Sequence, residues 1–229
     1  MSEVYDNYSI FAPEGKVRSF SSVENTVSLG NICLGIVSKD YGIIIGYMGE
    51  DNGLQYLSPK IHRITNNSIF SFAGITNDGL EIVNYLLHKS VEEDVGRDRE
   101  LDPMCVFDDY SFSAAEKGVF VSKRLCGAGG MLLSWYNNNI YLVEISPLGV
   151  IRRMKASAMG HRSQSAKTIL QKSVEEINSM DLKELIHLGV DSIKNTNVKD
   201  VHEHNLDVWV VDKNGGRKID VEELKNILK

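Results

Sequence analysis

The residues of this chain best suited to bind a metal are two histidines and two carboxylates near the C-terminus. His202, Glu203 and His204 are followed by Asp207, and imidazole and carboxylate groups are ligands that zinc accepts. Two histidines that are two residues apart on a loop supply at most two ligands, and no third ligand is evident. We therefore interpret this segment as a solvated loop before a strand, and we expect no metal and no cofactor.

A second candidate is the glycine run Gly127-Ala128-Gly129-Gly130, which resembles a phosphate cradle. The run lacks the G-K-[ST] of a P-loop, and it opens a predicted strand rather than a helix. Glycines at the start of a strand more often permit a tight bend or a close approach of two backbones. We therefore expect these glycines to have a packing role.

Nucleophiles are the third kind of candidate. The three cysteines, Cys33, Cys105 and Cys126, are widely spaced and form no C-x-x-C pair, which argues against a disulfide framework or a zinc ribbon and favours a reducing compartment. Neither G-x-S-x-G nor H-E-x-x-H occurs in the sequence. We interpret each cysteine as a small apolar core residue.

The elements that would have to position a site begin with a helix predicted over residues 21–29. Ser21 can accept a hydrogen bond from the first turn, Glu24 can reach back as in a capping box, and Gly30 can adopt the positive φ that follows many helices. Apolar and polar spacing then predicts the later elements. Strands are expected at 31–37, 41–47, 60–64, 68–73, 131–135, 140–145, 150–154, 156–159 and 207–211, and helices at 76–93, 102–118, 163–177, 181–194 and 221–228.

This order of strands, two helices, strands, two helices, a strand and a helix predicts an α+β fold. Two helix pairs that cover the outer faces of two mostly antiparallel sheets make a four-layer αββα sandwich. No linker rich in Pro, Gly or Ser divides the 229 residues. We therefore expect a single domain over 1–229, with a lead at 1–20, the N-terminal helix at 21–29 and the sandwich core at 30–229.

An enzyme class with this layer order is the N-terminal nucleophile hydrolase, in which a Thr, Ser or Cys at the chain start attacks and its free α-amine acts as base. The first strand is predicted to begin near Asn31, whose side chain is no nucleophile and whose nitrogen lies in a peptide bond. Ser28 and Cys33 are near that point but are not predicted at the first position of the strand. The sequence therefore indicates no catalytic residue.

Composition excludes other classes of protein. The formal net charge is −6 and the pI is near 5.5, whereas a nucleic-acid-binding protein usually has a basic face. The N-terminus has no apolar signal region, and no run approaches the roughly 18 apolar residues of a membrane span. We therefore expect a soluble intracellular protein that binds neither nucleic acid nor membrane.

Several short motifs together resemble the alpha subunits of the 20S proteasome. The N-terminal signature of that family, roughly Y-D-x-x-x-x-x-F-S-P-x-G-R-L, stands here as Tyr5-Asp6 and then Phe11 to Val17. Met159 to Thr168 is similar to the G-A-R-S-Q-S-A-R-T of the sixth subunit of the alpha ring. Ala73 to Asp78 resembles A-G-L-T-A-D, and Leu182 to Ile186 resembles L-x-E-L-V. The resemblance covers essentially the whole chain.

The resemblance implies the fold of the N-terminal nucleophile hydrolases without their catalytic threonine. It also implies a place in the outer seven-membered ring, next to other alpha subunits and above the beta ring that carries the peptidase sites. In the family, alpha N-termini form a gate over the axial pore, which assigns Tyr5, Asp6 and Pro13 to the gate. Activator C-terminal tails dock between alpha subunits on a lysine just before the third strand; here that lysine is Lys60, with Gly30 and Gly74 in the same pocket.

The resemblance thus implies a non-catalytic structural and gating subunit of the 20S core particle, acting in ubiquitin-dependent protein degradation in cytoplasm and nucleus. Ser21 and Ser22 depart from the family, which has Glu and Tyr there. The alternative function is an active self-processing hydrolase of the same fold, whose mature chain would begin with a new Thr, Ser or Cys.

Overall fold

The computed structural model of the chain describes residues 15–50, 53–54, 56–119, 124–196 and 201–228. The predicted gate residues Tyr5, Asp6 and Pro13 lie outside the described residues. Within the described part, no helix is long and apolar enough to cross a membrane.

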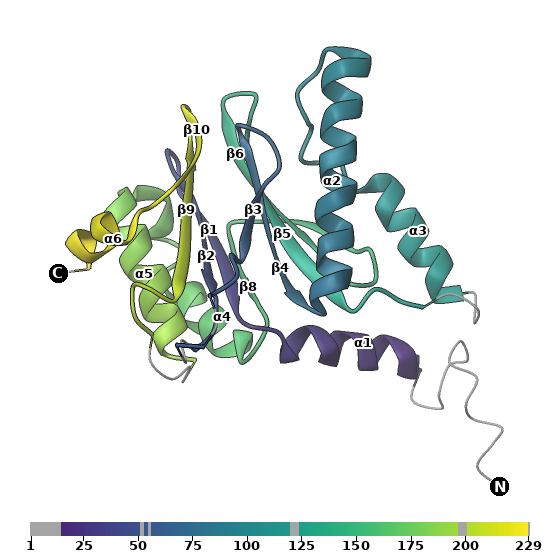
Figure 1. Cartoon of the computed structure of the whole chain (residues 1–229), viewed down its shortest axis with the longest axis horizontal. Coiled ribbons are helices and arrows are strands. Elements are labelled where there is room, and N and C mark those ends of the chain that lie inside the picture. The colour runs from purple at the N-terminus through teal and green to yellow at the C-terminus, as the bar shows by residue number, and fades with distance from the viewer. Residues whose placement is uncertain (1–14, 51–52, 55, 120–123, 197–200, 229) are drawn as a thin grey trace, which may run out of the picture.

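Two five-stranded antiparallel sheets form the centre of the fold (Figure 1). The first sheet has the order β10-β9-β2-β1-β8 and the second has the order β3-β4-β5-β6-β7. The strands of the first sheet are β1 (Cys33–Val37), β2 (Gly42–Tyr47), β8 (Ala156–Met159), β9 (Leu206–Asp212) and β10 (Gly215–Lys218). Those of the second are β3 (Ile61–Arg63), β4 (Ser68–Gly74), β5 (Ala128–Tyr136), β6 (Asn139–Ile145) and β7 (Ile151–Met154).

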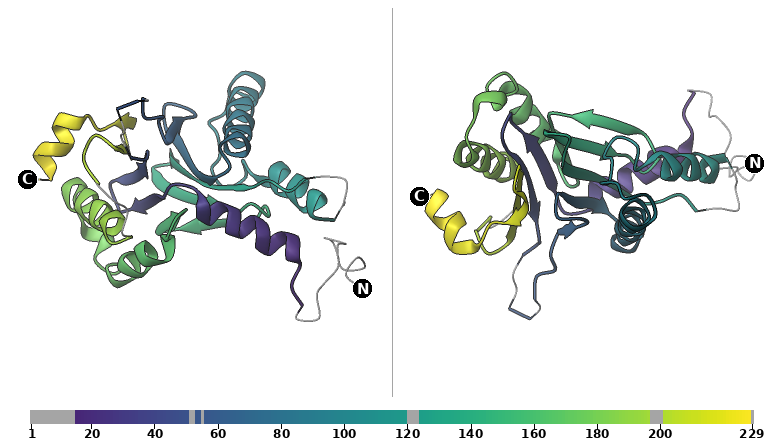
Figure 2. Two further views of the ribbon diagram at one scale, coloured as in Figure 1. Left: turned by 60° about the horizontal axis from the view of Figure 1, so that its bottom comes forward. Right: turned by 90° about the horizontal axis from the view of Figure 1, so that it is seen from above.

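Helices cover the outer face of each sheet, as the views from two directions show (Figure 2). The first sheet is covered by α4 (Ser163–Lys172), the short 3-10 helix η2 (Ile177–Ser179), α5 (Leu182–Lys194) and α6 (Val221–Ile227), and the second by α2 (Thr76–Arg97) and α3 (Asp108–Val119). α1 (Arg18–Leu29) lies across one end of the sheets and contacts β4 and β5 (Figure 1).

Three hydrophobic layers hold the four structural layers together. The first lies between the helices α4 to α6 and the first sheet, and the second lies between α2, α3 and the second sheet. The third layer, which includes Ile44, Ile69 and Met131, lies between the two sheets. β4 shows how alternation fills two layers at once, because Ile69 and Ala73 face the other sheet whereas Phe70 and Phe72 face α2. This arrangement confirms the predicted four-layer αββα sandwich.

The strands agree closely with the sequence prediction, whereas several helix starts do not. α1 begins at Arg18 rather than residue 21, its N-cap Val17 makes no side-chain bond, and Ser21 therefore lies inside the helix rather than in a capping box. Pro103 belongs to a turn in which Asp102 accepts a hydrogen bond from the backbone of Met104 at 2.8 Å, and α3 begins only at Asp108. The sequence prediction also missed β10, which is short and opens with two glycines.

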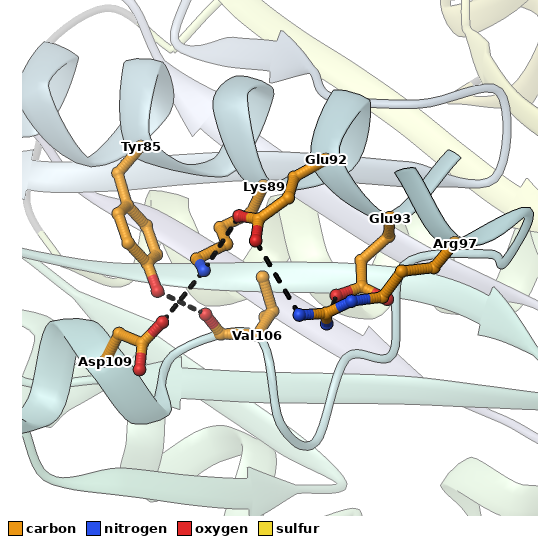
Figure 3. A network of polar contacts seen from close by, with 7 residues as sticks. All are labelled: Tyr85, Lys89, Glu92, Glu93, Arg97, Val106 and Asp109. Atoms are coloured by element: carbon orange, nitrogen blue, oxygen red, sulfur yellow. Dashed lines mark hydrogen bonds and ion pairs between the residues drawn. The ribbon is translucent and has the colours of Figure 1, made fainter. Parts of the chain in front are cut away.

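α2 and α3 are joined by polar contacts on their solvent side (Figure 3). The ammonium of Lys89 lies 2.8 Å from a carboxylate oxygen of Asp109 on α3 and 3.0 Å from one of Glu92. The hydroxyl of Tyr85 donates to the carbonyl of Val106 at 2.7 Å. Lys89 lowers the pKa of Asp109, yet ion pairs of this exposed kind contribute little to stability. These ion pairs are therefore a minor part of what holds α3 against α2.

Candidate functional site

The predicted pocket residue Lys60 lies at one end of the space between the sheets, directly before β3. Three cross-strand neighbours of the first sheet form a row beneath it: Cys33 on β1 pairs with Gly46 on β2, and Gly46 pairs with Asp207 on β9. Directly paired residues of an antiparallel sheet point to the same face. The missing side chain of Gly46 therefore leaves a slot between Cys33 and Asp207.

Lys60 fills this slot and is bonded at three of its groups. A Cβ added to Gly46 would lie 2.5 Å from the Cβ of Lys60. The carbonyl of Lys60 accepts a hydrogen bond from the hydroxyl of Ser71 at 2.8 Å. Its ammonium donates to the carbonyl of Phe72 at 2.9 Å and lies 5.3 Å from the centre of the Phe72 ring. An ammonium has three donors, so the carbonyl of Phe72 takes one and the group can donate to a further acceptor.

Asp207 holds the main chain at Lys60. Its side chain is fully buried, and one of its oxygens accepts the backbone N–H groups of Lys60 at 3.0 Å and of Ile61 at 3.1 Å. The other oxygen accepts from the indole of Trp209 at 3.2 Å and from the ammonium of Lys218 at 2.9 Å. A buried carboxylate needs partners of this number and kind to offset its desolvation.

Burial shifts the pKa values of Lys60 and Cys33. Desolvation lowers the pKa of Lys60, and the nearby Cys33 thiol acts in the opposite direction. Desolvation raises the pKa of Cys33, which Lys60 and a hydrogen bond with Ser71 partly offset. A thiol with a raised pKa is a poor nucleophile, so Cys33 is held in its neutral form.

The predicted pocket glycines Gly30 and Gly74 meet where α1 ends and β4 ends. A Cβ on Gly30 would lie 2.2 Å from the backbone nitrogen of Gly74, and a Cβ on Gly74 would lie 2.1 Å from the carbonyl oxygen of Gly127. Gly74 has φ +115°, a conformation that favours glycine. Gly30 instead has φ −71°, so the prediction of a positive φ there was wrong. Gly30 is required because two backbones touch.

Asp78 on α2 holds Gly127 in place next to the end of β4. Its buried carboxylate accepts the backbone N–H of Gly127 at 2.6 Å and pairs with Arg124. The backbone N–H of Ile75 donates to the carbonyl of Gly127 at 3.0 Å. The glycine run therefore brings β5 against the junction of β4 and α2, in agreement with the packing role expected from the sequence.

The structure brings the three predicted pocket residues to the same end of β4. Gly74 is two residues along that strand from Phe72, whose carbonyl binds Lys60, and Gly30 contacts Gly74. Sequence reasoning missed Ser71 and Gly46, and it considered Asp207 only as a metal ligand. A signal was present, since Asp207 is a carboxylate within a strand that otherwise reads as buried and apolar.

β1 begins at Cys33 rather than near Asn31, so a cysteine does occupy the first position of the strand. This corrects the prediction that no nucleophile stands there. The residues before it are nevertheless built into the fold: the carbonyl of Gly30 accepts from the backbone of His161 at 2.7 Å, and that of Ile32 accepts from Tyr47 at 2.9 Å. In the intact chain the nitrogen of Cys33 is a peptide nitrogen, so it cannot serve as a base.

The remaining candidates from the sequence are the histidine segment and the other two cysteines. Among the described residues no group of three or more His, Cys, Asp or Glu side chains is arranged to hold a metal. The ring of His204 lies 3.3 Å from the ammonium of Lys225. Cys126 is buried, as expected, but Cys105 is exposed, so the prediction that it is a core residue was wrong.

Comparison with known proteins finds proteasome subunits. Residues 27–211 match the family model described as "Proteasome subunit". The chain is 21% identical to the "Probable proteasome subunit alpha type-6" of Schizosaccharomyces pombe, over 89% of this chain and 75% of that protein. It is 23% identical to the "Proteasome subunit alpha type-6" of Saccharomyces cerevisiae, over 82% of each, and 22% identical to the "Proteasome subunit alpha type-1" of Drosophila melanogaster, over 91% and 77%.

Proposed function

This chain belongs to the proteasome subunit family, as an alpha-type member, and from that premise we propose that it is a non-catalytic subunit of the outer alpha ring of the 20S core particle. In this role it helps to control the admission of substrates and receives the C-terminal tails of activators. The process it serves is ubiquitin-dependent protein degradation in cytoplasm and nucleus. Its partners are neighbouring alpha subunits, the beta ring beneath them and the activators.

An apolar stripe on α2 supports assembly with other subunits. Leu80, Leu87, Val91 and Val95 lie on one side of the helix, and their exposed fractions are 38%, 38%, 60% and 80%. Their spacing of seven, four and four residues keeps them on a single helix face. Exposed apolar side chains that share one helix face are typical of a protein–protein interface.

The observation that carries the docking proposal is the position of Lys60. The residue is half-buried, its main chain is fixed at both ends, and its ammonium donates to Phe72 at the end of β4. A compact ammonium can receive a carboxylate that arrives in varied orientations. The C-terminal carboxylate of an activator tail is therefore the ligand that we assign to Lys60.

The contact of Gly30 with Gly74 supports a connection between docking and the gate. Gly30 directly follows α1, the helix that continues from the N-terminal lead, and Gly74 lies two residues from the carbonyl that binds Lys60. We propose that tail binding at Lys60 acts on α1 through this contact of Gly30 with Gly74. We assign Tyr5, Asp6 and Pro13 of that lead to the gate.

The test is Lys60→Ala in the assembled particle, with peptide hydrolysis measured against increasing amounts of a short synthetic peptide that copies an activator C-terminus. Loss of a charge-assisted contact costs on the order of 1.5–3 kcal/mol, so the half-maximal concentration should rise by roughly ten-fold or more. The control is Lys39→Ala, which removes an exposed lysine at the β1–β2 turn. Equal stimulation of the Lys60→Ala and unaltered particles would rule out Lys60 as the docking residue.

A second candidate function, a self-processing hydrolase, is favoured by one observation, namely that Cys33 opens β1 next to Lys60. The two functions differ in the mature N-terminus. A chain that retains Met1 or Ser2 supports the non-catalytic subunit, whereas a chain that begins at Cys33 would support the hydrolase. N-terminal sequencing of the chain from purified particles distinguishes them.

A further inference from the structure

We propose that Asp207, Ser71 and Gly46 are positioning residues that hold Lys60 where it can receive a C-terminal carboxylate. This inference rests on the proposed docking function and adds the part of the fold that makes a flexible lysine a defined receptor. The three residues come from β9, β4 and β2, so both sheets contribute.

The slot at Gly46 sets the position of the Lys60 side chain. Any side chain at this position would meet Lys60, because a Cβ there would lie 2.5 Å from its Cβ and 3.3 Å from its Cγ. The atoms that Lys60 would meet are the first ones of its side chain, close to the main chain, so they cannot swing aside as a chain end can. Gly46 thereby fixes where the side chain leaves the main chain.

The main chain of Lys60 is held on both sides. Asp207 accepts its N–H at 3.0 Å, and the hydroxyl of Ser71 donates to its carbonyl at 2.8 Å. Both side chains that make these bonds are buried, so water does not compete with them. What remains for Lys60 is rotation about its own side-chain bonds, and the carbonyl of Phe72 limits that rotation.

Asp207 positions Lys60 without neutralising it. Asp207 bonds to Lys60 through the main-chain N–H at 3.0 Å, whereas the ammonium paired with Asp207 is that of Lys218, at 2.9 Å. The charge of Asp207 is thus matched by a second lysine on β10. The ammonium of Lys60 keeps its own charge for an incoming carboxylate.

Asp207→Asn is the informative substitution because both carboxylate oxygens accept two hydrogen bonds each. An amide has one oxygen and one NH₂ group, so in either orientation the NH₂ faces two donors. Trp209→Phe is the matched control, because it removes one donor to the oxygen that does not contact the main chain of Lys60. Ser71→Ala tests the carbonyl side of Lys60 by removing one hydroxyl group.

The experiment is a double-mutant cycle in the assembled particle. Asp207→Asn and Ser71→Ala are each made alone and together with Lys60→Ala, and stimulation is measured with the synthetic tail peptide and with its C-terminal amide. We expect each single substitution to raise the half-maximal peptide concentration several-fold at unchanged maximal rate, and Trp209→Phe to change it less than two-fold. A residue that acts through Lys60 adds nothing once Lys60 is removed, so each double variant should match Lys60→Ala.

If the fold-increases in half-maximal peptide concentration of the two single variants multiply in the double variant, the residue acts independently of Lys60, which would overturn the inference. So would single variants that assemble and show no shift. If Asp207→Asn does not assemble, Ser71→Ala decides by the same criteria. A normal response of Lys60→Ala itself would refute the docking function as well, whereas a weakened response of Lys60→Ala with unshifted positioning variants would refute only this inference. The amide peptide should stimulate none of the particles at the concentrations used.

Discussion

Replacing Gly74 by alanine should destabilise the fold far more than the loss of any surface contact would. Gly74 has φ +115°, and a Cβ there would lie 2.1 Å from the carbonyl oxygen of Gly127 and 3.0 Å from the Cα of Ala128. The atoms that it meets belong to the backbone at the start of β5, where Gly127 is held by Ile75 and by the buried Asp78. No flexible side chain can move away to make room.

The magnitude follows from two separate costs. Placing a non-glycine residue in a sparsely populated backbone conformation costs about 1–3 kcal/mol, and forcing an extra carbon into a packed region costs about 1–3 kcal/mol more. The sum of about 2–6 kcal/mol compares with a total stability of about 5–15 kcal/mol for a typical protein. For a chain of this size each kcal/mol lowers the melting temperature by about 2–4 °C, so we expect a fall of roughly 4–24 °C.

Thermal unfolding of the full-length chain, followed by circular dichroism, measures this effect. Gly96→Ala is the matched control, because Gly96 lies in α2 with no atom within 4 Å of an added Cβ. Alanine favours a helix over glycine by about 0.5–1 kcal/mol, so this control should leave the melting temperature unchanged or raise it slightly. The same change from glycine to alanine is therefore expected to lower the melting temperature at Gly74 and to leave it unchanged or raise it slightly at Gly96. A Gly74→Ala chain that melts within about 2 °C of the unaltered chain would refute the close-approach argument.

Two further predictions concern ionisation and thiol reactivity. Burial lowers the pKa of Lys60 below the usual 10.5, so tail-peptide stimulation, normalised to the basal rate at each pH, should fall as the pH rises through a window below 10.5 and the ammonium loses its charge. Lys60→Arg, which stays protonated, should remove that fall, and a pH response shared by both particles would contradict the assignment. Alkylation of the native chain should label the exposed Cys105 before the buried Cys33. Because Asp102 raises the pKa of Cys105, the rate of its labelling should still increase above pH 9.0. Peptide mapping that found Cys33 labelled first would contradict the burial of Cys33.

The layer order could be predicted from the sequence because it depends on periodicity. β4 alternates between two hydrophobic layers, and β2 is apolar on both faces. The pattern of apolar residues therefore indicates that each of these strands lies between two layers. The two-residue turn at Asn137-Asn138 was also predictable, since both residues adopt positive φ, as asparagine does more readily than most residues.

Helix starts were less predictable because several residues can provide a first turn. α5 begins with a capping box between Asp181 and Glu184, whereas the same pattern at Ser21 and Glu24 falls inside α1, which starts one turn earlier. The packing of Val17 and Val27 into the protein decides the position of α1, not the serines. Tertiary contacts thus outweigh a local signal of about 1 kcal/mol.

The site was predictable only in part, for a geometric reason. Lys60 could be named by resemblance, but its contacts come from residues that are distant in the sequence, such as Asp207 at the far end of the chain. Strand order β9-β2-β1 brings them into one row, and nothing in the local sequence states that order. The close approach of Gly30 to Gly74 is hidden for the same reason.

The stripe on α2 has a consequence for how the cell must make this protein. The isolated chain exposes four apolar side chains of this stripe to water, namely Leu80, Leu87, Val91 and Val95. A copy without a partner therefore has an exposed apolar surface that can bind other proteins non-specifically. Synthesis in excess would feed aggregation or occupy chaperones rather than yield spare subunits. We therefore expect an isolated copy to aggregate more readily than one whose α2 stripe is covered by a partner.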